Sequence, residues 1–272
     1  YYRKFQKIIF SNLLTISFTI LGCGSSMGVP RADGYFGNCD PNEKKNYRSR
    51  CSAFIKSTHE NILIDTSPDL RYQLLNNNIK KIDRVLYSHL HGDQTHGIND
   101  LRVFYLKKKE VIPIYADKST SIYLKKTFGY CFKNNPTIPK SLDYPATLKI
   151  FPLKKKHIFS DILIKSIPVN HGNIDSMSFI INKKCAYASD AKLIYKNDIN
   201  SFRNLKYLVV DCLRYNEHPS HYNLYEVLEL VNQIKPKKTI LTNLHSDLDY
   251  KTLKNILPKN VIPAYDGLTL KL

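Results

Sequence analysis

The chain has 272 residues, 43% of them hydrophobic, and carries a formal net charge of +18. This length and composition support a full hydrophobic core and exclude a fibrous or disordered chain. The positive charge favours anionic partners such as phosphate esters or nucleic acid, although a composition rich in lysine and asparagine explains much of it without any function.

The cysteines are spread along the chain without a CxxC pair or a dense framework. This pattern is typical of reduced thiols, and we therefore expect a cytoplasmic protein. The six positions are Cys23, Cys39, Cys51, Cys131, Cys185 and Cys212.

The N-terminal segment admits two interpretations. A basic start followed by the largely apolar stretch 8–21 resembles a signal peptide. However, Ile16, Phe18 and Ile20 alternate with polar residues, which favours a half-buried strand over residues 13–22. No other segment has the ~18 apolar residues that a membrane span needs, so we expect no membrane association. We expect one domain over residues 1–272, with residues 1–12 as a poorly ordered extension outside the core.

The remaining elements follow from hydrophobic periodicity, in chain order. The first half of the chain predicts strands at 52–56, 61–65, 82–88 and 112–115, and helices at 69–77, 97–107 and 119–127. The second half predicts strands at 148–152, 162–169, 177–181, 185–188 and 238–242, and helices at 222–234 and 250–256. Groups of strands with helices between them indicate an α+β fold in which helices cover sheets.

The strongest chemical signal follows the predicted strand 82–88 and reads Ser-His-Leu-His-Gly-Asp-Gln-Thr-His-Gly. In extended backbone the side chains of His89 and His91 lie on the same side. A turn at Gly92 can then bring Asp93 to the same point. Two imidazoles and a carboxylate suit zinc, manganese or iron(II). A solvated polar loop is the alternative.

Further candidate ligands stand near the ends of other predicted strands. His171, Asp190 and His245 each follow or close a strand. If the sheets pack face to face, these strand ends converge on the first histidines, because loops at strand ends build active sites.

The order of these motifs resembles the metallo-β-lactamase superfamily. The resemblance implies a four-layer αββα sandwich that holds two metal ions. His89, His91 and His171 match the ligands of the first metal. Asp93 matches the carboxylate of the second, and Asp190 matches the bridging carboxylate. Asp65 matches an aspartate that supports the histidines from behind.

Within this superfamily the chain is similar, over nearly its whole length, to the branch of the phosphoribosyl 1,2-cyclic phosphate phosphodiesterases. The motifs that carry this similarity include residues 22–30, 50–52, 219–221 and 264–268. The resemblance implies a zinc- or manganese-dependent phosphodiesterase that acts on a small anionic (cyclic) phosphate ester, and we expect a homodimer. Asp93 and His221, a general acid, are the predicted catalytic residues, and Ser25, Ser26 and His218 are the predicted substrate contacts.

Two positions depart from the family pattern at the second metal. Gln94 and Asn243 stand where the family has histidines. His96 and His245 are possible replacements, each two residues further along. A structural zinc site is not expected, because only Cys39 remains of its cysteines. One metal ion is therefore expected, and the second is left open.

Two loops have both a functional and a structural interpretation. Backbone N–H groups of residues 22–28 could cradle a phosphate, or the glycines could simply permit a tight turn. The basic run 44–50 could bind an anion or RNA, or form a solvated loop, which we favour.

Two other functions stay open. A nuclease similar to ribonuclease Z would use the positive charge to hold nucleic acid. A non-catalytic carrier with one metal, similar to the pyrroloquinoline quinone biosynthesis protein B, would explain Gln94 and Asn243.

Overall fold

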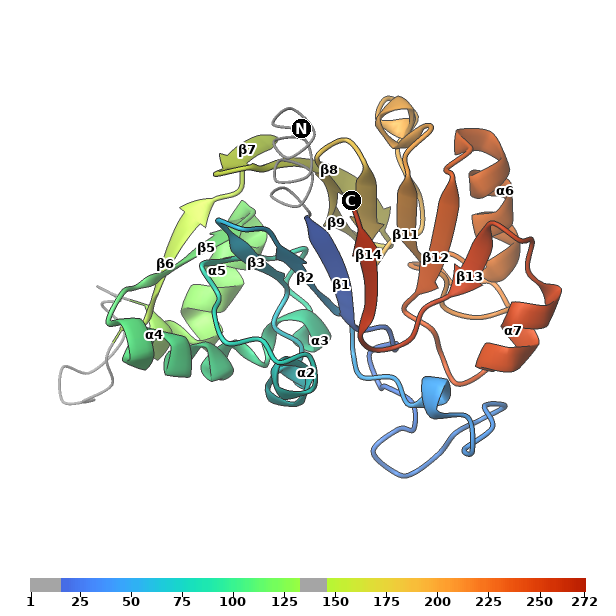
Figure 1. Ribbon diagram of the computed structural model, residues 1–272, viewed down its shortest axis with the longest axis horizontal. Coiled ribbons are helices and arrows are strands. Elements are labelled where there is room, and N and C mark those ends of the chain that lie inside the picture. The colour runs from blue at the N-terminus through green and yellow to red at the C-terminus, as the bar shows by residue number, and fades with distance from the viewer. Residues whose placement is uncertain (1–15, 133–145) are drawn as a thin grey trace, which may run out of the picture.

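The computed structural model describes residues 16–132 and 146–272. Two seven-stranded mixed sheets pack against each other, and helices cover the outer face of each sheet (Figure 1). The predicted four-layer αββα sandwich is therefore confirmed. The predicted extension 1–12 and the start of the predicted first strand lie outside the described residues.

The first sheet has the order β14-β1-β2-β3-β4-β5-β6. Its interior strand β1 carries the alternation seen in the sequence, because Ile16, Phe18 and Ile20 are buried. Helices α2 (Leu70–Asn76), α4 (Arg102–Lys108) and α5 (Lys118–Thr127) pack on its outer face. The strands are β1 (Ser17–Gly22), β2 (Ser52–Lys56), β3 (Asn61–Ile64), β4 (Arg84–Leu86), β5 (Ile112–Ala116), β6 (Leu148–Pro152) and β14 (Leu268–Lys271).

The second sheet has the order β13-β12-β11-β10-β9-β8-β7. Helices α6 (Leu224–Ile234) and α7 (Tyr250–Ile256) cover its outer face, and the apolar side of α6 packs there. The strands are β7 (Lys156–Phe159), β8 (Ile162–His171), β9 (Ile174–Ile181), β10 (Cys185–Ala188), β11 (Tyr207–Asp211), β12 (Lys238–Thr242) and β13 (Val261–Pro263).

The core between the two sheets joins the halves of the chain. Phe18 of β1 and Tyr187 of β10 meet there with ring centroids 5.5 Å apart. Ile64 from the first sheet and Val209 from the second are both fully buried in the same cluster. Burial of this apolar surface fixes the two sheets relative to each other, and therefore fixes the strand ends that carry the polar motifs.

Most predicted elements are found, and the differences have local causes. The helix predicted at 97–107 begins as a 3-10 turn, Ile98–Leu101, before α4. The helix predicted at 222–234 begins at Leu224, because the Asn223 side chain caps it and forms a capping box with Glu226. Strand β7 was not predicted. It is an edge strand that adjoins a run of lysines, and its exposed residues lack the apolar pattern of a buried strand.

The loop between β1 and β2 contains a buried arginine. Arg48 is only 2% exposed, which corrects the expectation of a fully solvated basic run. Its guanidinium donates to the carbonyl oxygens of Leu248 at 2.6 Å and His245 at 3.2 Å. It also donates to Asn46 Oδ1 at 3.0 Å. Arg48 therefore ties this loop to the segment that follows β12.

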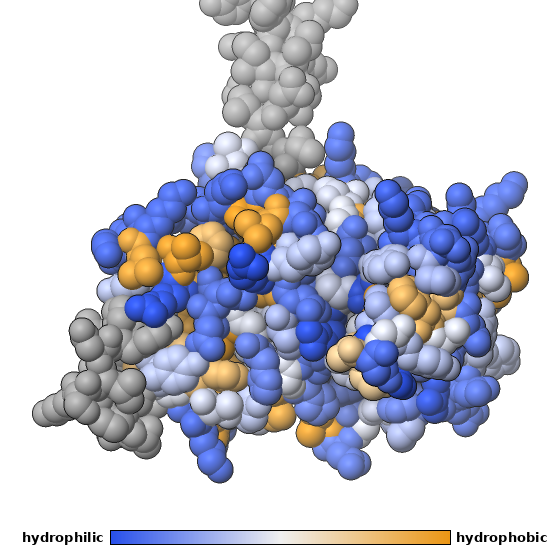
Figure 2. Space-filling model, turned by 90° about the horizontal axis from the view of Figure 1, so that it is seen from below, coloured by the Kyte–Doolittle hydropathy of each residue, from blue (hydrophilic) through white to orange (hydrophobic). Residues whose placement is uncertain are grey.

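The surface is predominantly polar. Seen from below, hydrophilic residues cover most of the face, and the hydrophobic residues form separate patches (Figure 2). Over the ranges 16–132 and 146–272, no helix has the length and apolar character required to cross a bilayer.

We predict that Arg48→Met lowers the free energy of unfolding by roughly 2–3 kcal/mol, because three acceptors inside the protein lose their donor. Urea unfolding followed by circular dichroism measures this change. Arg203→Met, at an exposed arginine, is the matched control and should stay within about 0.5 kcal/mol of wild type. Equal effects of the two substitutions would contradict a specific role for Arg48.

Candidate metal centre

Three histidine side chains converge between the two sheets. His89 and His91 lie in the loop after β4, and His171 closes β8. His91 Nδ1 lies 2.9 Å from His89 Nε2 and 3.3 Å from His171 Nε2. Nitrogens around a tetrahedral zinc ion, bound at 2.0–2.1 Å, lie roughly 3.3 Å from one another. The spacing of the three ring nitrogens therefore suits a metal ion.

Hydrogen bonds behind the rings set the protonation of two of these histidines. His171 Nδ1 lies 2.8 Å from the carbonyl oxygen of Ser220, so it must donate, and Nε2 keeps its lone pair. His89 Nδ1 lies 3.0 Å from Ser88 Oγ, which itself donates to Asp65 Oδ2 at 2.8 Å. Asp65 thus supports His89 through Ser88, in the supporting place expected from the sequence.

Burial keeps these histidines neutral. It lowers the pKa of His89 to about 3, and it also lowers the pKa of His91 and of His171. Neutral imidazole is the form that binds metals. His89 Nε2 and His171 Nε2 thus carry lone pairs beside His91 Nδ1, and three neutral imidazoles at this spacing fit a divalent metal ion.

Two carboxylates border the histidines. Asp190 follows β10, and the structure places it with His171 and His221 in a second group that could hold a metal ion. Asp93 lies in the short helix α3 (Gly92–Thr95). Burial, and next the charge of Asp190, raise the pKa of Asp93 to about 6. Each carboxylate therefore lies within the electrostatic field of the other.

Both positions that depart from the family pattern contact these carboxylates through amide nitrogens. Gln94 Nε2 donates to Asp93 Oδ2 at 3.1 Å and to Asp190 Oδ2 at 3.3 Å. Asn243 Nδ2 donates to Asp190 Oδ1 at 3.2 Å and to the carbonyl oxygen of Ser189 at 3.0 Å.

The two histidines suggested as replacements do not join the converging histidines. Asn243 has a φ of 60°, so the backbone is not extended there, although Asn243 and His245 both line one pocket. His245 pairs instead with Asp247 and belongs to neither metal-type group among the described residues. The turn of α3 places His96 outside the cluster, where its Nε2 lies 3.1 Å from Tyr123 Oη. The structure therefore does not support either as a ligand.

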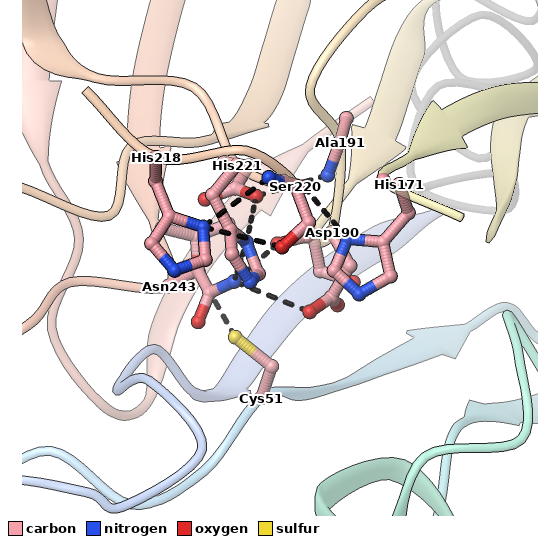
Figure 3. A network of polar contacts seen from close by, with 12 residues as sticks. Cys51, His171, Asp190, Ala191, His218, Ser220, His221 and Asn243 are labelled. Carbon is pink, nitrogen blue, oxygen red and sulfur yellow. Dashed lines mark hydrogen bonds and ion pairs between the residues drawn. The ribbon is translucent and has the colours of Figure 1, made fainter. Parts of the chain in front are cut away.

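A buried aspartate holds His221. Asp211 ends β11, and its Oδ2 lies 2.6 Å from His221 Nδ1. Figure 3 shows His221 beside Asn243, whose Nδ2 lies 3.2 Å from the same ring nitrogen. Burial alone would lower the pKa of His221, but the Asp211 carboxylate reverses this and raises the pKa to about 9. Since Nδ1 is occupied, Nε2 is the ring nitrogen left for a substrate. Sequence reasoning missed Asp211, although its place at a strand end is the signal that identified the other candidates.

A pocket of about 340 Å³ opens beside these groups. Its wall includes Ser25, Ser26 and His218, the predicted substrate contacts, and also Arg214, which was not predicted. The hydroxyl of Ser25 is buried and has no hydrogen-bond partner among the described residues. The volume suits a small ligand, within the range of small-molecule sites.

The glycine-rich loop, residues 22–28, contributes hydroxyl groups to the pocket wall. Most of its backbone N–H groups that could cradle a phosphate are already engaged. The backbone N–H groups of Cys23, Gly24, Ser25 and Gly28 all donate within the protein. A Cβ at Gly22 would lie 2.2 Å from the carbonyl oxygen of Arg50. The tight-turn interpretation therefore accounts for most of the loop.

A family model described as "Beta-lactamase superfamily domain" matches residues 60–243. The chain belongs to this superfamily. Its metallo-β-lactamase fold is shared with a crystal structure described as a new diphosphatase from the PhnP family. That structure has 28% identity and a TM-score of 0.84, and the alignment covers 95% of this chain and 97% of that one. The predicted branch of the superfamily is thereby supported.

Two curated relatives match this metallo-β-lactamase-fold chain over only part of their own length. An octanoyltransferase of Porphyromonas gingivalis is 30% identical over 257 residues, which are 92% of this chain and 50% of that protein. A ribonuclease Z of Azobacteroides pseudotrichonymphae is 24% identical over 189 residues, which are 67% of this chain and 57% of that protein. The chain thus spans half the length of the first relative and 57% of the second.

We predict that His89→Ala removes most of the tightly bound metal, because one of three converging nitrogens is lost. Elemental analysis after loading with Zn²⁺ or Mn²⁺ and desalting measures the content. His96→Ala, in the same segment but outside the cluster, should retain the wild-type content. Loss of metal from His96→Ala and not from His89→Ala would overturn the assignment.

Proposed function

We propose that the chain is a metal-dependent phosphodiesterase that acts on small phosphate esters, including cyclic ones. The observation that carries this proposal is the three converging histidine nitrogens, because two of these histidines, His91 and His171, line a pocket of about 340 Å³. A diphosphatase of the same fold at 28% identity adds support, because a diphosphatase also hydrolyses a phosphorus–oxygen bond.

His89, His91 and His171, together with Asp190, would hold the metal ion. Zinc and manganese both accept imidazole and carboxylate ligands. When bound, the ion supplies a nucleophile at neutral pH, by lowering the pKa of water, and neutralises charge on the phosphoryl oxygens.

The protein's own groups perform the proton transfers. His221 lines the pocket, and its Nε2 donates a proton to the departing alkoxide oxygen. Asp211 holds the ring in the orientation that makes this possible, through its contact with Nδ1. Asp93 lines the same pocket and accepts a hydrogen bond from the attacking water, while Gln94 fixes the carboxylate.

Arg214 supplies a permanent positive charge at the pocket. Among the described residues that line it, Arg214 is the one lysine or arginine. Its Nη2 donates to the carbonyl oxygen of Glu217 at 2.6 Å, and its Nε donates to that of Asn216 at 3.3 Å. These bonds orient the guanidinium, so we propose that Arg214 binds a second anionic group of the substrate.

We predict that the Zn²⁺- or Mn²⁺-loaded protein hydrolyses bis-p-nitrophenyl phosphate, and that His89→Ala lowers kcat/KM at least ~10³-fold, because charge neutralisation at phosphorus is lost. Release of p-nitrophenolate measures the rate. His96→Ala serves as the control and should keep nearly full activity. Undiminished turnover by His89→Ala would contradict the proposal.

We predict that Arg214→Met raises KM roughly tenfold for adenosine 2′,3′-cyclic phosphate carrying a 5′-phosphate. The effect on the same compound without the 5′-phosphate should be much smaller, because only the extra anion meets the guanidinium. Steady-state kinetics on the two substrates separate KM from kcat. Equal losses on both substrates would count against a role in recognising a second anion.

A nuclease is the second candidate, favoured by the net charge of +18 and the ribonuclease Z relative. RNA binding that weakens steeply with salt, together with RNA cleavage, would favour it over a small ester. Tight metal binding without turnover of either substrate class would favour the single-metal carrier instead.

A further inference from the structure

Asp93 and Asp190 form the carboxylate pair at which a second cation would be expected. Both line the same pocket, and one side-chain amide lies within hydrogen-bond distance of an oxygen of each. Two neighbouring carboxylates in a largely buried place need a positive partner, or hydrogen-bond donors, between them. What lies between these two therefore decides whether this carboxylate pair holds an ion.

The NH₂ group of Gln94 lies between them. Its Nε2 donates to Asp93 Oδ2 and to Asp190 Oδ2, and the side chain is fully buried. The other oxygen of Asp190 accepts from Asn243 Nδ2, which is also buried. Amide N–H groups thus satisfy both oxygens of Asp190.

The orientation of both amides follows from their surroundings. Asn243 Nδ2 also donates to the carbonyl oxygen of Ser189. Turning this amide would therefore point its oxygen at two acceptors. Turning Gln94 would point Oε1 at two carboxylates, and Oε1 has no partner among the described residues in its present position. An amide N–H group donates and cannot bind a metal ion, so these side chains present no ligand atoms to the carboxylate pair.

We propose that the NH₂ groups of Gln94 and Asn243 take the place of a second cation beside Asp190, so that the centre holds one metal ion per chain, at His89, His91 and His171. This inference rests on the metal site of the proposed function. It makes Asp190 a carboxylate held in place by two amides and not one shared between two ions.

The proposal also identifies the groups that neutralise the negative charge of the substrate. With a single ion, the positive charge around a bound phosphate ester comes from that ion, Arg214 and His221, all at one pocket. This arrangement suits a small ester with more than one anionic group, which is the substrate class proposed above.

The first test counts metal ions in the wild-type protein. After loading with excess Zn²⁺ or Mn²⁺, elemental analysis should give one ion per chain, and calorimetric titration should give a single binding event. Electron paramagnetic resonance of the Mn²⁺ form should show the six-line signal of isolated ions. Two ions per chain, or a spin-coupled manganese spectrum, would overturn the proposal.

The titration also includes Mg²⁺ and Ca²⁺ added to the Zn²⁺-loaded protein. These ions prefer oxygen ligands, and they would bind only if the amide oxygens turned toward the carboxylates. We expect no further binding event. A second event with either ion would overturn the proposed orientation of the amides.

The second test restores ligands. Gln94→His combined with Asn243→His replaces two donors with two imidazoles and should raise the Zn²⁺ content toward two ions per chain. Asn170→His adds an imidazole on the opposite face of β8 from His171 and should leave the content at one. If the double variant does not fold, the wild-type count and spectrum decide. A folded double variant that still binds one ion contradicts the proposal.

Metal count and hydrolysis are separate readouts. One ion per chain with no ester hydrolysis sustains this inference and defeats the proposed function. Two ions per chain with hydrolysis sustains the function and defeats this inference.

Discussion

The metal centre depends on one geometric constraint, which is that ring nitrogens of His89 and His171 are held close to Nδ1 of His91. His89 and His171 are each held from behind, by Ser88 with Asp65 and by the carbonyl oxygen of Ser220. These bonds leave an unprotonated Nε2 on each ring facing His91 Nδ1. This arrangement presents two lone pairs to one point, as binding of a metal ion requires, and the two packed sheets keep the rings from separating.

The sandwich explains why residues far apart in the chain meet. β4 of the first sheet leads to His89 and His91, while β8, β10 and β11 of the second sheet lead to His171, Asp190 and Asp211. Burial of Phe18, Ile64, Tyr187 and Val209 between the sheets fixes the distance between these strand ends. Arg48 then ties the loop after β1 to the segment after β12, beside Asn243. The polar site is thus a consequence of apolar packing.

The sequence predicted the fold and the histidine cluster because both rest on local patterns. Alternation along β1 and the apolar runs of β2, β6 and β12 needed no tertiary information. The metal-ligand roles predicted for His96 and His245 are not supported, and the reason is different. Each depended on a backbone turn, α3 in one case and the φ of 60° at Asn243 in the other, and neither angle can be read from residue types. Arg48 was missed because its burial depends on carbonyl groups 197 and 200 residues away. Asp211 could have been found from its strand end.

The central claim is that three histidine nitrogens form the ligand set of a bound metal ion. X-ray absorption spectroscopy of the zinc-loaded protein tests this directly, because scattering distances identify the ligand atoms. The account predicts three imidazole nitrogens at about 2.0–2.1 Å, completed by oxygen. A spectrum with sulfur at about 2.3 Å, or one without imidazole scattering, would contradict it.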